Sequence, residues 1–92
     1  MKNIIFSARW REELDAISDE GVLTFELTMG RYQVYFPTQS RWLTQVPDWA
    51  KDQWEDYKNA CVQWCQKEKI PIVFVDDAHV SFETKKDKGA SE

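Results

Sequence analysis

Two cysteines and the single histidine are the residues of this sequence best suited to nucleophilic or metal chemistry. Cys61 and Cys65 lie four positions apart, which on a helix places both thiols on one face. Together with His79 they begin a zinc site, but such a site needs about four ligands, and the sequence has no second Cys or His pair. We therefore expect both cysteines to be small buried hydrophobic residues. A catalytic pair of cysteine and histidine is less favoured still, because a core-facing thiol is poorly ionised.

A second group of chemically capable residues is the segment Asp76-Asp77-Ala78-His79. Carboxylates and an imidazole in one loop can bind a hard metal ion or perform acid–base catalysis. Aspartate is also common in turns, because its side chain accepts hydrogen bonds from nearby backbone amides. We expect ordinary turn chemistry and no cofactor here. A small metal protein or enzyme that uses Asp76, Asp77 and His79 is the alternative.

Arginines interleaved with aromatic residues could bind single-stranded nucleic acid by combining charge with ring stacking. Such residues are scattered through the first half of the chain: Arg9, Trp10, Arg11, Arg31, Tyr35, Arg41 and Trp42. The net charge of −4 and the pI of about 5.0 argue against a binder that relies on a broad cationic surface. Nucleic-acid binding is therefore kept only as a further alternative.

The elements that must position these residues include a long amphipathic helix, predicted from Pro47 to about Lys69. Proline is tolerated in the first turn, and acidic residues near the start with lysines at the end suit the helix dipole. Its apolar stripe consists of Ala50, Trp54, Tyr57, Cys61, Trp64 and Cys65. A stripe with this spacing predicts that the helix is the packing centre of the fold.

Alternating apolar residues predict two strands, from Val22 to Thr28 and from Arg31 to Phe36. With Met29-Gly30 as a two-residue loop, Phe25 faces Val34, and the apolar side chains of both strands gather on one face. A slip by one residue would destroy this sorting. The pattern therefore predicts an antiparallel hairpin.

The remaining segments predict another helix and a second hairpin. Trp10, Leu14 and Ile17 share a helical face, so we expect a helix from Ala8 to Asp19 after a short strand at residues 3–6. The nearly continuous apolar run at residues 70–76 predicts a strand that is covered on both faces. A turn at residues 77–78 would pair it with a strand at residues 79–84.

Together these elements predict an α+β fold in the order (β)αββαββ. Its antiparallel sheet consists of two hairpins, with the long helix packed on one face. We expect one small domain over residues 1–84 and a disordered polar tail over residues 85–92. No apolar run approaches the length of a membrane span or a signal peptide, so we expect a cytoplasmic protein that does not bind membranes. Two reduced thiols fit that compartment.

Several apolar residues have no obvious partner in this expected fold: Trp42, Trp49, Val62, Ile72 and Phe74. A contiguous patch of such residues would mark a contact site. We therefore predict a non-catalytic protein-interaction module, an inhibitor, adaptor or subunit that binds another protein or forms a homodimer. The predicted anchors and rim contacts are Trp42, Trp49, Arg41, Tyr35 and Arg31.

Overall fold

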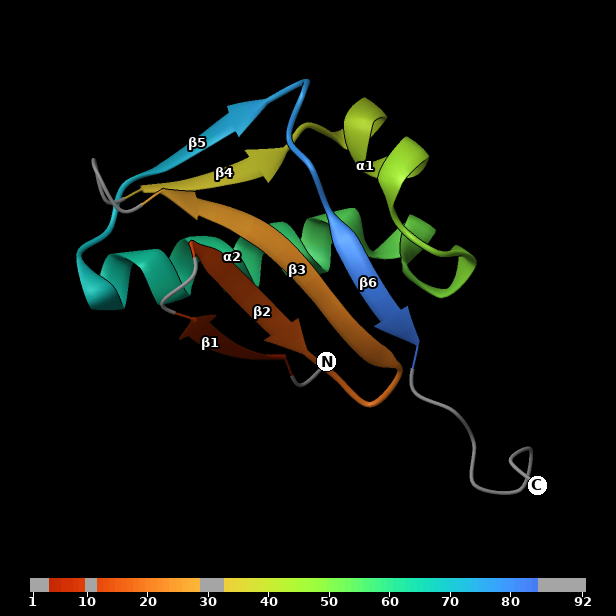
Figure 1. Cartoon of the computed structure of the whole chain (residues 1–92), viewed down its shortest axis with the longest axis horizontal. Coiled ribbons are helices and arrows are strands. Elements are labelled where there is room, and N and C mark those ends of the chain that lie inside the picture. The colour runs from red at the N-terminus through yellow and green to blue at the C-terminus, as the bar shows by residue number, and fades with distance from the viewer. Residues whose placement is uncertain (1–3, 10–11, 29–32, 85–92) are drawn as a thin grey trace.

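The computed structural model describes residues 4–9, 12–28 and 33–84, which form a sheet with helices against it (Figure 1). The elements in chain order are β1 (Ile5–Arg9), β2 (Glu13–Ile17), β3 (Gly21–Thr28), β4 (Gln33–Pro37), α1 (Gln39–Gln45), the 3-10 helix η1 (Asp48–Gln53), α2 (Trp54–Glu68), β5 (Ile72–Val75) and β6 (Ser81–Thr84). The predicted α+β class is confirmed. The predicted tail at residues 85–92 lies outside the described residues.

One sheet joins all the described strands in the order β1-β2-β3-β4-β5, with β6 beside β3. The long strand β3 pairs with β2 along one edge. Along its other edge, the first half of β3 pairs with β6 and the second half with β4. The β4–β5 pair is parallel and the others are antiparallel. Within the described chain, β1, β5 and β6 therefore each have one paired edge only.

The predicted helix from Ala8 to Asp19 is wrong, because the described part of this segment forms the antiparallel strands β1 and β2. Leu14 and Ala16 both point into the core and are fully buried, which is the two-residue period of a strand. Leu14 lies opposite Phe25 of β3, so burial against the sheet outweighs the helical spacing of Leu14 and Ile17.

The predicted hairpin of β3 and β4 is confirmed, but its register differs from the expected one by two residues. Leu27 pairs with Val34, whereas a two-residue loop would have placed Phe25 there. A shift of two keeps every side chain on its predicted face, so these three residues are buried as expected. The predicted loop residues Met29 and Gly30 lie outside the described part of the chain.

The predicted long helix is confirmed as two consecutive segments, η1 and α2, and α2 crosses the sheet on one face (Figure 1). Four residues of its predicted stripe are buried: Ala50, Tyr57, Cys61 and Cys65. Lys69 follows in the left-handed conformation, with a φ of 61°, and its N–H donates to two carbonyls of the last turn. None of the described helices has the length and apolar character needed to cross a membrane.

The predicted second hairpin is wrong, because its two strands pair with different partners. Helix α2 carries the chain back to the start of β4, so β5 runs parallel to β4, with Phe74 beside Phe36. Strand β6 pairs with β3 instead, where Phe82 lies opposite Leu23. Strand β5 is also not covered on both faces, since Phe74 is 42% exposed.

The core between sheet and helices is centred on four aromatic residues: Phe25, Phe36, Trp42 and Tyr57. Neighbouring ring centroids in this cluster lie 4.9 to 6.2 Å apart. The Tyr57 hydroxyl donates to Ser18 Oγ at 3.1 Å, so its polar end has a partner. Burying one such ring contributes roughly 4–6 kcal/mol as an upper bound. The cluster therefore holds α1 and α2 against β3 and β4.

Candidate functional site

Strand β5 is built from residues that favour extended backbone, Ile-Val-Phe-Val over Ile72–Val75. Hydrogen bonds at its two ends define its orientation. The Pro71 carbonyl accepts from the Val34 N–H at 3.0 Å, and the Val75 carbonyl accepts from the Thr38 N–H at 3.1 Å. Both carbonyls therefore face β4.

The other side of β5 presents backbone groups that have no neighbouring strand in the described chain. Because backbone groups alternate in direction along a strand, the N–H and C=O groups of Ile72 and Phe74 face away from β4. Pro71 belongs to the set that faces β4, so its missing N–H does not interrupt the outward row. Edge strands are commonly protected by charges or bulges, and β5 contains no charged residue.

An apolar groove of about 540 Å³ runs beside β5, between Phe74 and helix α2. The Phe74 ring packs edge-on against buried Phe36, with centroids 5.8 Å apart, and its other side is open. The groove is lined by Thr38, Gln39, Trp54, Lys58, Asn59, Val62 and Phe74. An exposed sheet edge and a preformed apolar groove therefore share one strand.

Trp54 is held in the groove lining by two interactions. Its indole Nε1 donates to the Pro37 carbonyl at 3.0 Å, which ties α2 to the end of β4. The Lys58 Nζ lies 4.8 Å from the centroid of the Trp54 ring, a cation–π contact. These contacts hold the ring in place without a bound ligand, so the groove is formed in advance.

Charges of opposite sign lie at the two ends of β5. Lys67 and Glu68 at the end of α2 and Lys69 in its cap precede the strand with a net charge of +1, and all three are exposed. Asp76 and Asp77 follow it, and both are exposed. The Thr38 hydroxyl donates to Asp76 Oδ1 at 2.7 Å, which holds the acidic end against the start of α1.

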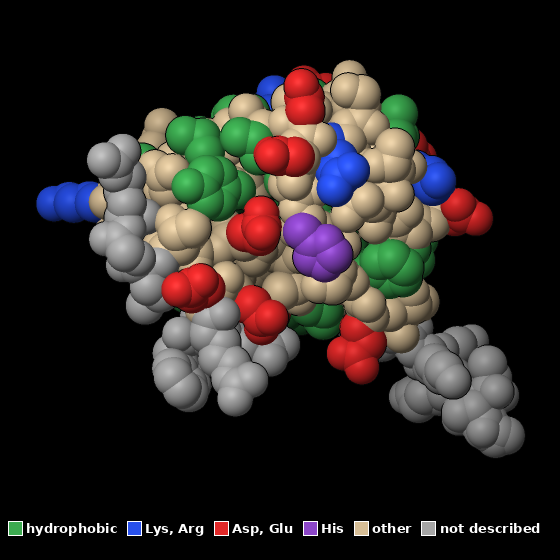
Figure 2. Space-filling model, turned by 45° about the horizontal axis from the view of Figure 1, so that its top comes forward, with side chains coloured by type: hydrophobic (Ala, Val, Ile, Leu, Met, Phe, Trp, Pro, Cys, Tyr) green, Lys and Arg blue, Asp and Glu red, His purple; other side chains and the backbone are tan. Residues whose placement is uncertain are grey.

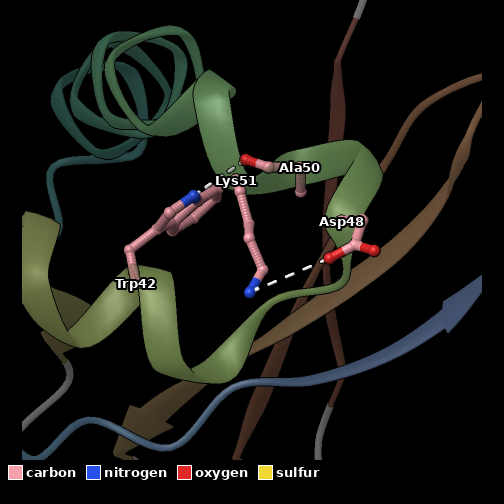
Figure 3. A network of polar contacts seen from close by, with 4 residues as sticks. All are labelled: Trp42, Asp48, Ala50 and Lys51. Carbon is pink, nitrogen blue, oxygen red and sulfur yellow. Dashed lines mark hydrogen bonds and ion pairs between the residues drawn. The ribbon is translucent and has the colours of Figure 1, made fainter.

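Trp42, a predicted anchor, is fully buried in the core. Its Nε1 donates to the Ala50 carbonyl at 2.8 Å and so joins α1 to η1 (Figure 3). Nearby, the Lys51 ammonium and the Asp48 carboxylate form an ion pair of 3.8 Å (Figure 3). The ring has no exposed surface to offer a partner, so its role in the structure is packing.

Trp49, the other predicted anchor, is half-buried and also makes local contacts. Its Nε1 donates to Thr84 Oγ1 at 3.1 Å, which joins η1 to β6. The ring covers Gly21, where an added Cβ would lie 2.7 Å from Trp49 Cζ2. A contact of Trp49 with a partner stays a prediction.

The predicted rim residues lie on different parts of the fold. Arg41 Nε donates to the Ala78 carbonyl at 2.8 Å and joins α1 to the segment after β5. Tyr35 lies on the sheet face opposite the core, where its hydroxyl accepts a hydrogen bond from Gln33 Nε2 at 2.9 Å. Arg31 lies outside the described residues.

The residues considered for nucleic-acid stacking are not assembled on one described surface. Trp42 is buried, while Tyr35 lies on the opposite sheet face. Trp10, Arg11 and Arg31 lie outside the described residues. Nucleic-acid binding stays an untested alternative.

Asp76, Asp77 and His79 do not assemble into a metal site. The His79 backbone N–H donates to Glu26 Oε1 at 3.4 Å, whereas Asp76 Oδ1 accepts from the Thr38 hydroxyl at 2.7 Å. His79 borders a polar hollow of about 220 Å³, and Figure 2 shows carboxylates beside its side chain. Among the described residues, no three His, Cys, Asp or Glu side chains are placed to hold a metal ion.

Cys61 and Cys65 are free and buried on α2, as predicted. A hydrogen bond with Cys65 and removal from water raise the pKa of the Cys61 thiol. The Cys61 thiol therefore stays protonated at neutral pH and is a poor nucleophile.

The residues of the groove left a partial signal in the sequence. Val62 and Phe74 had no obvious partner in the expected fold, and both line the groove. Ile72 also had none there, but it packs partly buried against the core. Trp54 was assigned to the core stripe alone. The open edge of β5 was hidden, because the predicted hairpin covered it with residues 79–84.

Comparison with known proteins found no match, whether among protein-family models, curated proteins or solved structures. Function must therefore be inferred from the β5 edge and its groove.

Proposed function

We propose that this chain is a non-catalytic protein-interaction module, an adaptor, inhibitor or subunit of an assembly. Its binding surface is the outward edge of β5 together with the apolar groove beside Phe74. The observation that supports this function is that the two features coincide. The outward backbone groups of Ile72 and Phe74 and a partly exposed aromatic ring lie on one edge strand.

The occupant is an extended segment of a protein chain. A strand that joins a sheet edge gains main-chain hydrogen bonds, while pockets for alternate side chains give specificity. Ile72 and Phe74 project toward the α2 face, so alternate side chains of an added strand would lie over the groove. Its lining by Phe74, Val62 and Trp54 favours an apolar side chain there.

The cysteines support a cytoplasmic site of action. Cys61 and Cys65 are unpaired thiols in the core. Reducing compartments keep thiols in this state, whereas secreted small domains commonly use their cysteines in disulfides.

Peptide selection tests this function without knowledge of the natural partner. A displayed library of random peptides, about twelve residues long, is selected against the full chain at low concentration. We expect enrichment of peptides with alternating apolar residues, the pattern of a half-buried strand. The Phe74→Ala variant should bind the selected peptides about tenfold more weakly or worse, because the groove loses its exposed ring.

Phe82→Ala is the matched control for that substitution. Phe82 is 49% exposed on edge strand β6, and Phe74 is 42% exposed on edge strand β5. The control variant should bind the selected peptides as the wild type does. The proposal fails if no peptides are enriched, or if Phe74→Ala binds them as well as Phe82→Ala does.

A further inference from the structure

The charges that flank β5 change sign from one end of the strand to the other. Lys67, Glu68 and Lys69 lie before its start with a net charge of +1, and Asp76 and Asp77 lie at its end with a charge of −2. Residues 70–75 between them carry no charge. Such a strand complements itself only in the antiparallel direction, because the basic end of one copy then meets the acidic end of the other.

We propose that β5 pairs with β5 of a second copy of this chain, antiparallel and about a two-fold axis. The inference rests on the proposed function and names its partner. A contact of this kind uses the same patch on both copies, which is the commonest symmetry of soluble oligomers.

The outward backbone groups define the register. Within β5, Ile72 and Phe74 direct their N–H and C=O groups away from β4. In one register, the outward N–H and C=O groups of both residues form hydrogen bonds in both copies. In this register Ile72 lies opposite Phe74 of the partner subunit, and Val73 lies on the two-fold axis. The same register brings the end that carries Lys69 toward the end of the partner subunit that carries Asp77, with Lys69 in the left-handed cap of α2 and Asp77 in the turn after β5. This meeting of opposite charges occurs at both ends of the paired strands. Backbone geometry and charge therefore favour the same arrangement.

The pairing also covers exposed apolar surface. The side chains of Ile72 and Phe74 lie on the α2 face of the sheet, and cross-strand partners share a face. The sheet therefore continues across the axis with both α2 helices on one side. Phe74 of the partner subunit lies beside Ile72, next to the groove that Val62 lines. Burial of these side chains supplies the apolar core of the interface.

The other two edge strands of the described chain fit a second copy less well. Strand β1 contains Ser7, and β6 contains Ser81 and Glu83. Polar and charged side chains on an edge strand discourage pairing with another sheet. Strand β5 carries its charges only beyond its ends, where they set the direction of pairing rather than oppose it.

Solution mass measured against protein concentration tests the self-pairing. Sedimentation equilibrium from about 1 to about 500 µM should show the mass rising toward twice that of the chain. Lys69→Glu and Asp77→Lys each place like charges at both ends of the paired strands. Each variant should raise the dissociation constant of its own dimer by about tenfold or more. A mixture of the two restores opposite charges at both ends, so it should form a heterodimer as tight as the wild-type dimer.

Asp52→Lys is the matched control, because Asp52 is exposed on η1 and the net charge changes by the same amount as in Asp77→Lys. It should dimerise like the wild type. A wild-type chain that keeps the monomer mass of 10.9 kDa at every concentration would overturn the inference. So would a dimer that Lys69→Glu and Asp77→Lys leave unchanged, or a mixture that does not recover the wild-type affinity.

The two proposals fail in distinguishable ways. A chain that stays monomeric but selects peptides through Phe74 overturns the self-pairing, and the interaction module stands with another partner. A chain that stays monomeric and selects no peptides overturns both.

Discussion

Replacing Trp42 with alanine should destabilise the fold rather than weaken binding alone. The ring is fully buried, and its Nε1 donates to the Ala50 carbonyl at 2.8 Å. Truncation of a buried tryptophan costs about 3–5 kcal/mol. The carbonyl left without its donor adds about 1–3 kcal/mol. We therefore expect the free energy of unfolding to fall by about 4 kcal/mol or more, a large share of the roughly 5–14 kcal/mol expected for a chain of this size.

Urea unfolding followed by far-ultraviolet circular dichroism measures this loss, in protein dilute enough to be monomeric. With a slope of about 1 kcal/mol per molar urea, the midpoint should fall by about 4 M, or the variant should be unfolded without urea. Trp42→Phe keeps a ring but loses the N–H and about 40 Å³, so it should cost about 2–4 kcal/mol. A Trp42→Ala midpoint within about 0.5 M of the wild type would refute the buried position of this ring.

Three further variants test individual features of the fold, and the free energy of unfolding of each is measured by the same urea assay. Gly21→Ala should cost about 2 kcal/mol or more, because its Cβ would lie 2.5 Å from the Glu83 carbonyl oxygen; an unchanged midpoint would contradict that close approach. The raised pKa of Cys61 contributes stability that is complete below about pH 8.5 and is lost above it at about 1.4 kcal/mol per pH unit, as the unfolded thiol ionises. The double variant Cys61→Ala/Cys65→Ala should lack this share of the slope, because Cys61→Ala alone would leave the buried Cys65 without the hydrogen bond that lowers its pKa; equal slopes above about pH 8.5 would argue against it. Lys69→Gly should stabilise the monomer by about 1 kcal/mol or less, because the φ of 61° suits glycine; a lower midpoint would contradict this.

The side chains that face the core were more predictable than the strand pairing. Phe25, Leu27 and Val34 are buried as the alternating pattern requires. Their register was shifted by two residues, because such a shift leaves the same side chains on the same faces. Apolar alternation therefore could not choose between the two registers.

Tertiary contacts explain the errors at both ends of the chain. Leu14 and Ile17 have helical spacing, yet Leu14 is buried opposite Phe25 in the sheet. Residues 70–84 resemble a hairpin locally, but α2 delivers β5 parallel to β4, and β6 finds an open place beside β3. Neither placement follows from short-range pattern, because both depend on neighbours far away in the chain.

The candidate site, like the fold, depends on tertiary contacts that the local sequence pattern does not show. Trp42 and Trp49 were expected at an interface because amphipathic tryptophan serves both cores and contacts. Hydrogen bonds to Ala50 and Thr84 engage both indoles within the fold. Phe74 was identifiable as an unpartnered ring, but its place on an open edge required the pairing of β5 with β4.

Amide hydrogen exchange along β5 tests most directly the claim that its outward edge pairs with a second copy of the chain. The N–H groups of Val73 and Val75 face β4, so they should be protected at every protein concentration and serve as internal references. The N–H groups of Ile72 and Phe74 should exchange rapidly in dilute protein and become protected at concentrations where the mass doubles. Rapid exchange at Phe74 at every concentration, with Val73 still protected, would contradict the self-pairing.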